Sequence, residues 1–176
     1  MITIIKSSLT VFFLSTMLLI FMGHSNFAQT NNPELNVVSP MTLGNPGAPV
    51  KIIEYSSFTC PYCATFHLDV LPKIKKKYLD KGLVQLEYRE VYFDGPGLWA
   101  GLLARCNGDE KYFPMIDLIF KNQQYWAKGN IDNIKEGLLS MGRQAGLTDE
   151  ESLACMQDDD LAEQMVVSFQ KKCQKR

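Results

Sequence analysis

Residues 56–66 read Ser-Ser-Phe-Thr-Cys-Pro-Tyr-Cys-Ala-Thr-Phe, and this stretch decides how the rest of the chain is interpreted. A β-rich run over 50–55 precedes it, and apolar residues follow it at helical spacing over 66–79. Pro61 suits the first turn of a helix, where the missing N–H costs nothing. The pattern therefore predicts a strand-to-helix turn with Cys60 at the N-terminus of the helix.

The two cysteines of this Cys-x-x-Cys pair are expected to differ. Unpaired amides and the positive end of the helix dipole favour a thiolate at Cys60, whereas Cys63 lies most of a turn inside and is expected to be more covered. This predicts one nucleophilic and one resolving thiol. A zinc site that adds His67 is the alternative, but no fourth ligand is evident. We therefore predict redox chemistry with no metal and no cofactor.

Residues 1–28 are expected to be a signal peptide. Lys6 supplies a positive start, an apolar run covers 9–22, and a short polar exit ends at the small residue Ala28. An uncleaved membrane anchor is the alternative, although the run is short for a membrane span. The prediction is export to the periplasm of a bacterial envelope, with a polar lead-in over 29–40.

Composition excludes several classes of protein. With 46% hydrophobic and 21% charged residues the chain is ordinary for a globular protein, so we do not expect disorder. A net charge of −1 gives no electrostatic reason to expect a nucleic acid or an acidic lipid as partner. The residues after the predicted signal peptide suffice for one domain with a moderate core.

Five cysteines in an exported chain imply disulfides. Besides the Cys60–Cys63 pair, Cys106 and Cys155 are predicted to form a structural disulfide, because both lie in the helical region described below. The alternative is a pair of buried free thiols. Cys173 is then left without a partner.

The remaining patterns predict an α/β fold. A second strand over 83–92 makes a strand–helix–strand unit with a parallel pair, and Pro72 is expected to kink its helix. A short edge strand is expected over 35–38. We predict one section over 41–95 that carries the cysteine pair and a helical section over 96–176. Its helices are expected over 98–106, 110–123, 131–145, 149–156 and 159–172, with starts at Gly108-Asp109, Asn130 and Thr148, the last forming a capping box with Glu151.

Residues 48–67 resemble the strand and active-site signature of DsbA-like thioredoxin-fold proteins. Residues 70–78 (Val-Leu-Pro-Lys-Ile-Lys-Lys-Lys-Tyr) and 87–94 (Glu-Tyr-Arg-Glu-Val-Tyr-Phe-Asp) are similar to that family too, as is a helical section after the second strand. The resemblance implies a thioredoxin-like fold with a large inserted helical subdomain. The family continues beyond its last helix into a cis-proline loop and further strands, so this chain is expected to be C-terminally incomplete.

The resemblance also assigns roles. Cys60 is the attacking cysteine and Cys63 the resolving one, and Glu54 occupies the position of a buried acid that takes and returns the Cys63 proton. A carboxylate turned to solvent or paired with a lysine is the alternative for Glu54. Pro61 and Tyr62 tune the thiolate, and Tyr62 replaces the histidine of DsbA itself, which implies a less oxidising disulfide.

The implied function is that of a periplasmic protein disulfide oxidoreductase. It would pass the Cys60–Cys63 disulfide to reduced secreted proteins and be reoxidised by a membrane oxidase. Disulfide formation is favoured over isomerase or reductase activity, which is the second alternative. The first alternative is a catalytically impaired remnant, or a non-enzymatic exported module that needs a partner to complete its sheet.

Overall fold

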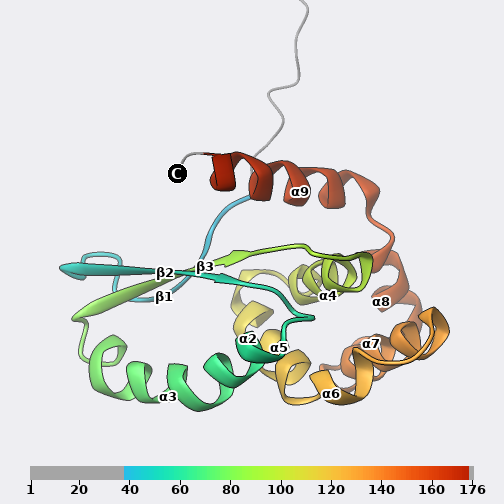
Figure 1. Ribbon diagram of the computed structural model, residues 1–176, viewed down its shortest axis with the longest axis horizontal. Coiled ribbons are helices and arrows are strands. Elements are labelled where there is room, and N and C mark those ends of the chain that lie inside the picture. The colour runs from blue at the N-terminus through green and yellow to red at the C-terminus, as the bar shows by residue number, and fades with distance from the viewer. Residues whose placement is uncertain (1–37, 175–176) are drawn as a thin grey trace, which may run out of the picture. The chain divides into compact units, whose positions relative to one another are not determined.

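The computed structural model describes residues 38–174, and in them a three-stranded mixed sheet forms the centre of the fold (Figure 1). Its strands are β1 (Met41–Gly44), β2 (Val50–Ser56) and β3 (Val84–Glu90), in the order β1-β3-β2. β2 runs parallel to β3, and β1 runs antiparallel to it. The predicted parallel strand–helix–strand unit is therefore confirmed. The predicted signal peptide and the side chain of Cys173 lie outside the described residues.

Most of the edge strand predicted over 35–38 lies outside the described residues. The first strand that the structure describes, β1, was not predicted and begins at Met41, directly after Pro40. Of the expected segment only Val38 is described, and its N–H donates to the hydroxyl of Ser168 rather than to a strand. Because Pro40 has no N–H to add to a sheet, regular pairing starts after it.

The helix after the cysteine pair alternates between α-helical and π-helical turns. The predicted kink at Pro72 takes the form of a wider turn just before it, where the N–H of Leu71 donates to the carbonyl of Phe66. A proline ring would clash with the carbonyl four residues earlier, and the wider turn relieves that clash. The segments are α2 (Pro61–Thr65), η1 (Phe66–Val70), α3 (Leu71–Ile74) and η2 (Lys75–Leu79).

The helical section matches the prediction within a few residues, with two differences. α4 begins at Gly95 rather than at residue 98, and a short helix, α6, follows α5 directly. Asn122 leaves the helical conformation at φ −105°, ψ 6°, and this separates the two. The predicted starts at Gly108, Asn130 and Thr148 are confirmed as N-caps. The helices are α4 (Gly95–Arg105), α5 (Asp109–Lys121), α6 (Gln123–Trp126), α7 (Ile131–Gln144), α8 (Asp149–Met156) and α9 (Asp159–Gln174).

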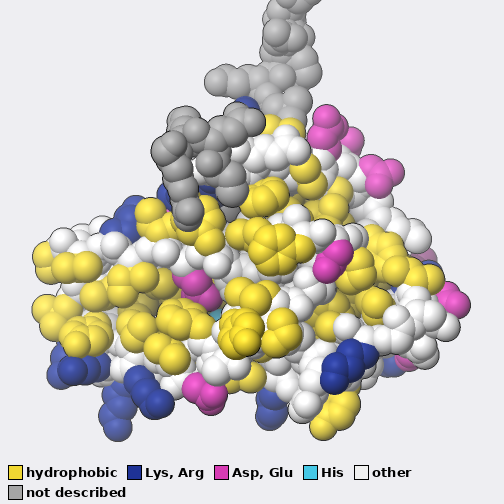
Figure 2. All heavy atoms as spheres, viewed as in Figure 1, with side chains coloured by type: hydrophobic (Ala, Val, Ile, Leu, Met, Phe, Trp, Pro, Cys, Tyr) yellow, Lys and Arg dark blue, Asp and Glu magenta, His cyan; other side chains and the backbone are white. Residues whose placement is uncertain are grey.

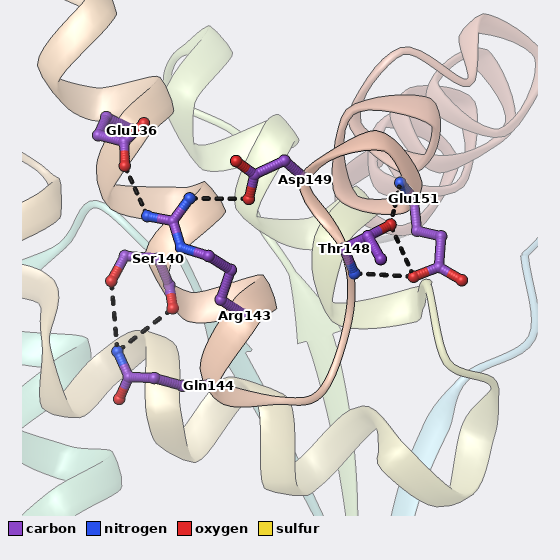
Figure 3. A network of polar contacts seen from close by, with 7 residues as sticks. All are labelled: Glu136, Ser140, Arg143, Gln144, Thr148, Asp149 and Glu151. Atoms are coloured by element: carbon purple, nitrogen blue, oxygen red, sulfur yellow. Dashed lines mark hydrogen bonds and ion pairs between the residues drawn. The ribbon is translucent and has the colours of Figure 1, made fainter.

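A polar network surrounds the connection between α7 and α8 (Figure 3). The Thr148 hydroxyl accepts a hydrogen bond from the N–H of Glu151, whose carboxylate accepts one from the N–H of Thr148, so the predicted capping box is confirmed. Arg143 bridges Glu136 and Asp149 at 2.5 and 2.7 Å. Solvent screens these exposed ion pairs, so the caps matter more for where the helices end and begin.

The main core joins the helical section to the sheet. Phe58, from the loop before Cys60, packs on Tyr88 of β3 and on Phe120 of α5. A second cluster of Leu71, Leu79, Val84 and Leu86 fills the space between the sheet and the helix after the cysteines. Burying each such large apolar side chain contributes roughly 1.5–3 kcal/mol. The cysteine loop is therefore anchored in the core by Phe58.

The last helix, α9, lies on the other side of the sheet from α3 (Figure 1). Met165 is 2% exposed, and the ring of Phe169 meets that of Tyr92 edge to face at 5.9 Å between centroids. A Cβ added at Gly101 of α4 would come within 2.9 Å of the Met165 methyl carbon. Gly101 therefore lets α4 and α9 approach closely.

Candidate active site

Cys60 is the N-cap of α2, in extended backbone conformation at φ −87°, ψ 117°. Its carbonyl accepts the N–H of Cys63 at 3.1 Å and that of Ala64 at 3.2 Å, so the first turn begins at this residue. Pro61 occupies the first helical position, where no N–H is needed. Cys60 and Cys63 are free thiols here, and both are partly exposed.

The two thiols have opposite pKa shifts. Burial by itself raises the pKa of Cys60, but hydrogen bonds from the Cys63 thiol and from the backbone N–H groups of Cys63 and Tyr62 outweigh it and lower the pKa. Burial raises the pKa of Cys63, and the neighbouring Cys60 sulfur raises it further. The sequence predicted this difference from the helix N-terminus alone. Cys60 can therefore act as a nucleophile while Cys63 holds its proton.

Glu54 lies on β2 opposite Tyr88 of β3, and the residue is 9% exposed. Neither of its carboxylate oxygens has a hydrogen-bond partner in the described part of the chain. Burial raises the pKa of this carboxyl, and His67 and Ser56 oppose the rise only in part. A buried acid without partners favours its protonated form, so the Glu54 carboxyl can hold a proton to a higher pH than an exposed glutamate does.

Glu54 and Cys63 line the same groove, which runs along the outer edge of β2. Its volume is about 390 Å³, and Tyr62 and Phe66 from the helix form its other wall. Figure 2 shows hydrophobic side chains spread in a band across this view of the molecule, with Lys and Arg near its lower rim. No strand of residues 38–174 pairs with this edge of β2. The groove therefore leaves the open edge of β2 beside Cys63.

Tyr62, between the cysteines, is 86% exposed. Its backbone N–H bonds to the Cys60 sulfur, so the residue acts on the thiolate through the main chain while its ring faces solvent. A ring in this position can contact whatever approaches the Cys60 sulfur.

Sequence reasoning missed Gln123. This α6 residue is buried, and its side-chain amide donates to the carbonyls of Phe58 at 2.8 Å and Cys60 at 2.9 Å. On the other side of the loop, the Thr59 hydroxyl donates to Asp94, the N-cap of α4. The helical section thus holds the cysteine loop from two directions. A glutamine inside a helical run carries no sequence signal for this role, because its partners lie 63 and 65 residues away in the chain.

Cys106 and Cys155 form a disulfide with 5.6 Å between their Cα atoms. It joins the end of α4 to α8, far along the chain from the redox pair.

His67 lies at the start of the π-helical turn η1, where its Nε2 contacts Asp117 of α5. Across residues 38–174, no three His, Cys, Asp or Glu side chains converge in a way that could hold a metal ion. In the same range, no helix has the length and apolar character required to cross a bilayer.

The comparisons with known proteins agree with this geometry. The sequence model of the thioredoxin family matches residues 36–176. A putative protein-disulfide oxidoreductase of Rickettsia bellii is 36% identical over 129 residues, which are 73% of this chain and 49% of the relative. One from Rickettsia felis is 33% identical over 149 residues, covering 80% of this chain and 53% of the relative. The chain thus spans about half the length of the curated relatives it matches.

Solved structures show to which group of thioredoxin-fold proteins the chain is similar. The crystal structure of Wolbachia pipientis α-DsbA1 superposes with a TM-score of 0.68 at 30% identity, covering 78% of this chain and 69% of that one. The chain therefore belongs to the thioredoxin family, within its DsbA-like thiol-disulfide oxidoreductases. The predicted thioredoxin-like fold with a helical insertion is confirmed.

Proposed function

We propose that this protein exchanges the Cys60–Cys63 disulfide with cysteines of other proteins. The observation that carries the proposal is the opposite pKa shift of the two thiols beside the buried carboxyl of Glu54. Cys60 and Cys63 are the catalytic thiols, and Glu54 is the acid that serves Cys63. Pro61 and Tyr62 tune the Cys60 thiolate, and the Cys106–Cys155 disulfide is structural.

The exchange proceeds through a mixed disulfide. A substrate thiolate attacks the Cys60 sulfur, the Cys60–Cys63 bond breaks, and Cys63 leaves as a thiolate that takes the Glu54 proton. A second substrate thiolate then attacks the substrate sulfur of the mixed disulfide and releases Cys60 as a thiolate. The substrate dithiol loses two electrons and becomes a disulfide, and the Cys60–Cys63 disulfide gains the same two electrons.

The favoured direction is disulfide formation. Hydrogen bonds that stabilise the Cys60 thiolate stabilise the reduced form of the pair, and a stable reduced form makes the disulfide a better oxidant. Continued turnover then requires an electron acceptor, for which we propose a membrane oxidase. Reduced secreted proteins are the proposed substrates.

The proposed location is the periplasm. It is supported by the signal-peptide pattern of residues 1–28 and by the Cys106–Cys155 disulfide, since such bonds persist in oxidising compartments. We further propose that residues 41–95 supply the redox pair and that 96–176 hold its loop in place, as the bond from Gln123 to Cys60 suggests.

Redox titration in glutathione buffers, read by differential alkylation and peptide mass spectrometry, tests the function. We expect a single Cys60–Cys63 transition, with Cys106–Cys155 resisting reduction. Cys60→Ser should abolish exchange with a reduced protein substrate and leave folding intact. The matched variant Cys63→Ser, incubated with oxidised glutathione, should instead accumulate a Cys60–glutathione mixed disulfide: the Cys60 thiolate attacks one glutathione sulfur, the other glutathione leaves as a thiolate, and no Cys63 thiol resolves the new bond. Full activity in Cys60→Ser would contradict the assignment of the nucleophile.

A further inference from the structure

His67 is a buried histidine that the exchange mechanism above does not use. It is 3% exposed, and its ring lies 4.7 Å from that of Phe120 between centroids, at an interplanar angle of 35°. Its Nδ1 atom is buried and has no hydrogen-bond partner among the described residues. A buried imidazole with one nitrogen unpaired calls for an explanation, because leaving a buried polar atom unsatisfied is costly.

The other ring nitrogen of His67, Nε2, contacts an acid whose side chain is exposed to solvent. Nε2 of His67 lies 2.5 Å from Oδ1 of Asp117 on α5, and the Asp117 side chain is 70% exposed. The Asp117 carboxylate can accept a hydrogen bond from Nε2 whenever that nitrogen carries a proton. Asp117 and the Phe120 ring thus hold His67 from the same helix, α5.

His67 also interacts electrostatically with Glu54 of β2, which is buried as well. The charge of His67 acts on the Glu54 carboxyl and lowers its pKa against the larger effect of burial. Three other titratable or polar groups face Glu54: Ser56 on the same strand, Cys63 across the groove and Tyr88 on β3. Burial raises the pKa of Tyr88 well above its usual value, so its phenol stays neutral. His67 is then the one group in this set that can bring a positive charge to Glu54.

We propose that His67 is a positioning residue for Glu54: its imidazolium, held by Asp117, stabilises the carboxylate that forms when Glu54 gives its proton to Cys63. The proposal rests on the proposed exchange reaction, in which that proton moves from the Glu54 oxygen to the Cys63 sulfur. The negative charge passes from the sulfur to the buried carboxylate, where it would be costly without a nearby cation. The exposed carboxylate of Asp117 keeps the cation in place.

The direct test is an NMR titration of side-chain carboxyl carbons in the folded protein labelled at glutamate, with the Glu54 signal assigned by Glu54→Gln. In His67→Gln the titration midpoint of Glu54 should rise by roughly one pH unit, because a nearby opposite charge is lost. Asp117→Asn should move it in the same direction by less. Asp69→Asn is the matched control, since Asp69 is an exposed acid on the same turn as His67, and it should leave the midpoint unchanged.

A kinetic readout links this charge to exchange. The pH dependence of mixed-disulfide formation should move to higher pH in His67→Gln, because Glu54 keeps its proton longer. In a Glu54→Gln background, His67→Gln should add no further shift. Asp117→Asn changes only an exposed side chain, so it tests the coupling of His67 to Glu54 even where His67→Gln fails to fold.

An unchanged Glu54 midpoint in both His67→Gln and Asp117→Asn would overturn the proposal, whatever the rate of exchange. If the wild-type protein exchanged no disulfides but the midpoint still rose, the proposed function would fail while the coupling of His67 to Glu54 would stand. An equal shift in Asp69→Asn would also overturn it, because a general loss of negative charge would then explain the effect.

Discussion

The side-chain amide of Gln123 donates to the carbonyl oxygen of Cys60 at 2.9 Å, which ties α6 to the first cysteine of the redox pair. The same nitrogen donates to the carbonyl of Phe58 at 2.8 Å, so one buried side chain satisfies two acceptors of the loop. The backbone N–H groups that stabilise the Cys60 sulfur belong to the helix that starts at this loop. The helical section therefore holds the backbone of the first cysteine through one buried amide.

Gln123→Leu removes both bonds and keeps a side chain of similar size. It should reduce the free energy of unfolding by about 1–3 kcal/mol, because two buried carbonyls lose their donor. It should also raise the pKa of Cys60, since the loop no longer holds the amides of the first turn in place. Thermal melting and a pH titration of thiolate absorbance measure the two effects. Gln124→Leu changes the exposed neighbour and should alter neither quantity; equal behaviour of the two variants would contradict the role of Gln123.

Glu54→Gln should stabilise the fold at neutral pH while it impairs exchange. The folded-state pKa of Glu54 is raised, so the folded protein binds its proton more tightly than the unfolded chain does. Stability therefore falls as the pH rises from the unfolded-state pKa to the raised folded-state pKa, and stays lower above it. The gain in melting temperature should be a few degrees near pH 7 and should vanish below roughly pH 4.

Glu87→Gln is the matched control with the opposite sign. Burial alone raises the pKa of this buried β3 carboxylate, but Arg89 and Lys51 outweigh it, so the folded-state pKa is lowered. The contribution of the Glu87 carboxylate to the free energy of unfolding is present above the unfolded-state pKa and is lost as the pH falls through the folded-state pKa. Glu87→Gln should therefore lower the melting temperature at pH 7. The interpretation of Glu54 would be wrong if both variants shifted stability in the same direction.

Replacing Cys106 and Cys155 with alanine together should destabilise the folded state without removing the redox pair. The bond closes a loop with a sequence separation of 49 residues, and on the chain-entropy model such a cross-link contributes about 4 kcal/mol. Melting the double variant and the parent in the absence of reductant measures the loss. Exchange by Cys60 and Cys63 should persist below the lowered melting temperature, and Cys173→Ser in both proteins prevents scrambled pairing. A variant as stable as its parent would show that the bond is dispensable.

Local patterns predicted much of the fold. The N-caps at Asn130 and Thr148 were readable because a cap needs only residues within one turn. The strand β1 and the helix α6 were not predicted because both are short, and neighbours in space decide where short elements begin. The widened turn at η1 was expected only as a kink, since Pro72 requires a distortion but does not select its form.

The redox pair itself could be read from the chain, because Cys60, Pro61 and Cys63 at the start of a helix depend on neighbours within a few residues. The family resemblance, not the local pattern, had implied a buried acid at Glu54. Two further relationships became visible only in the folded chain: the hydrogen bonds from Gln123 to the cysteine loop and the contact of Asp117 with His67. Burial and long-range contacts are set when strands and helices pack together. The sequence determines which thiols can react, and packing decides which charges and amides surround them.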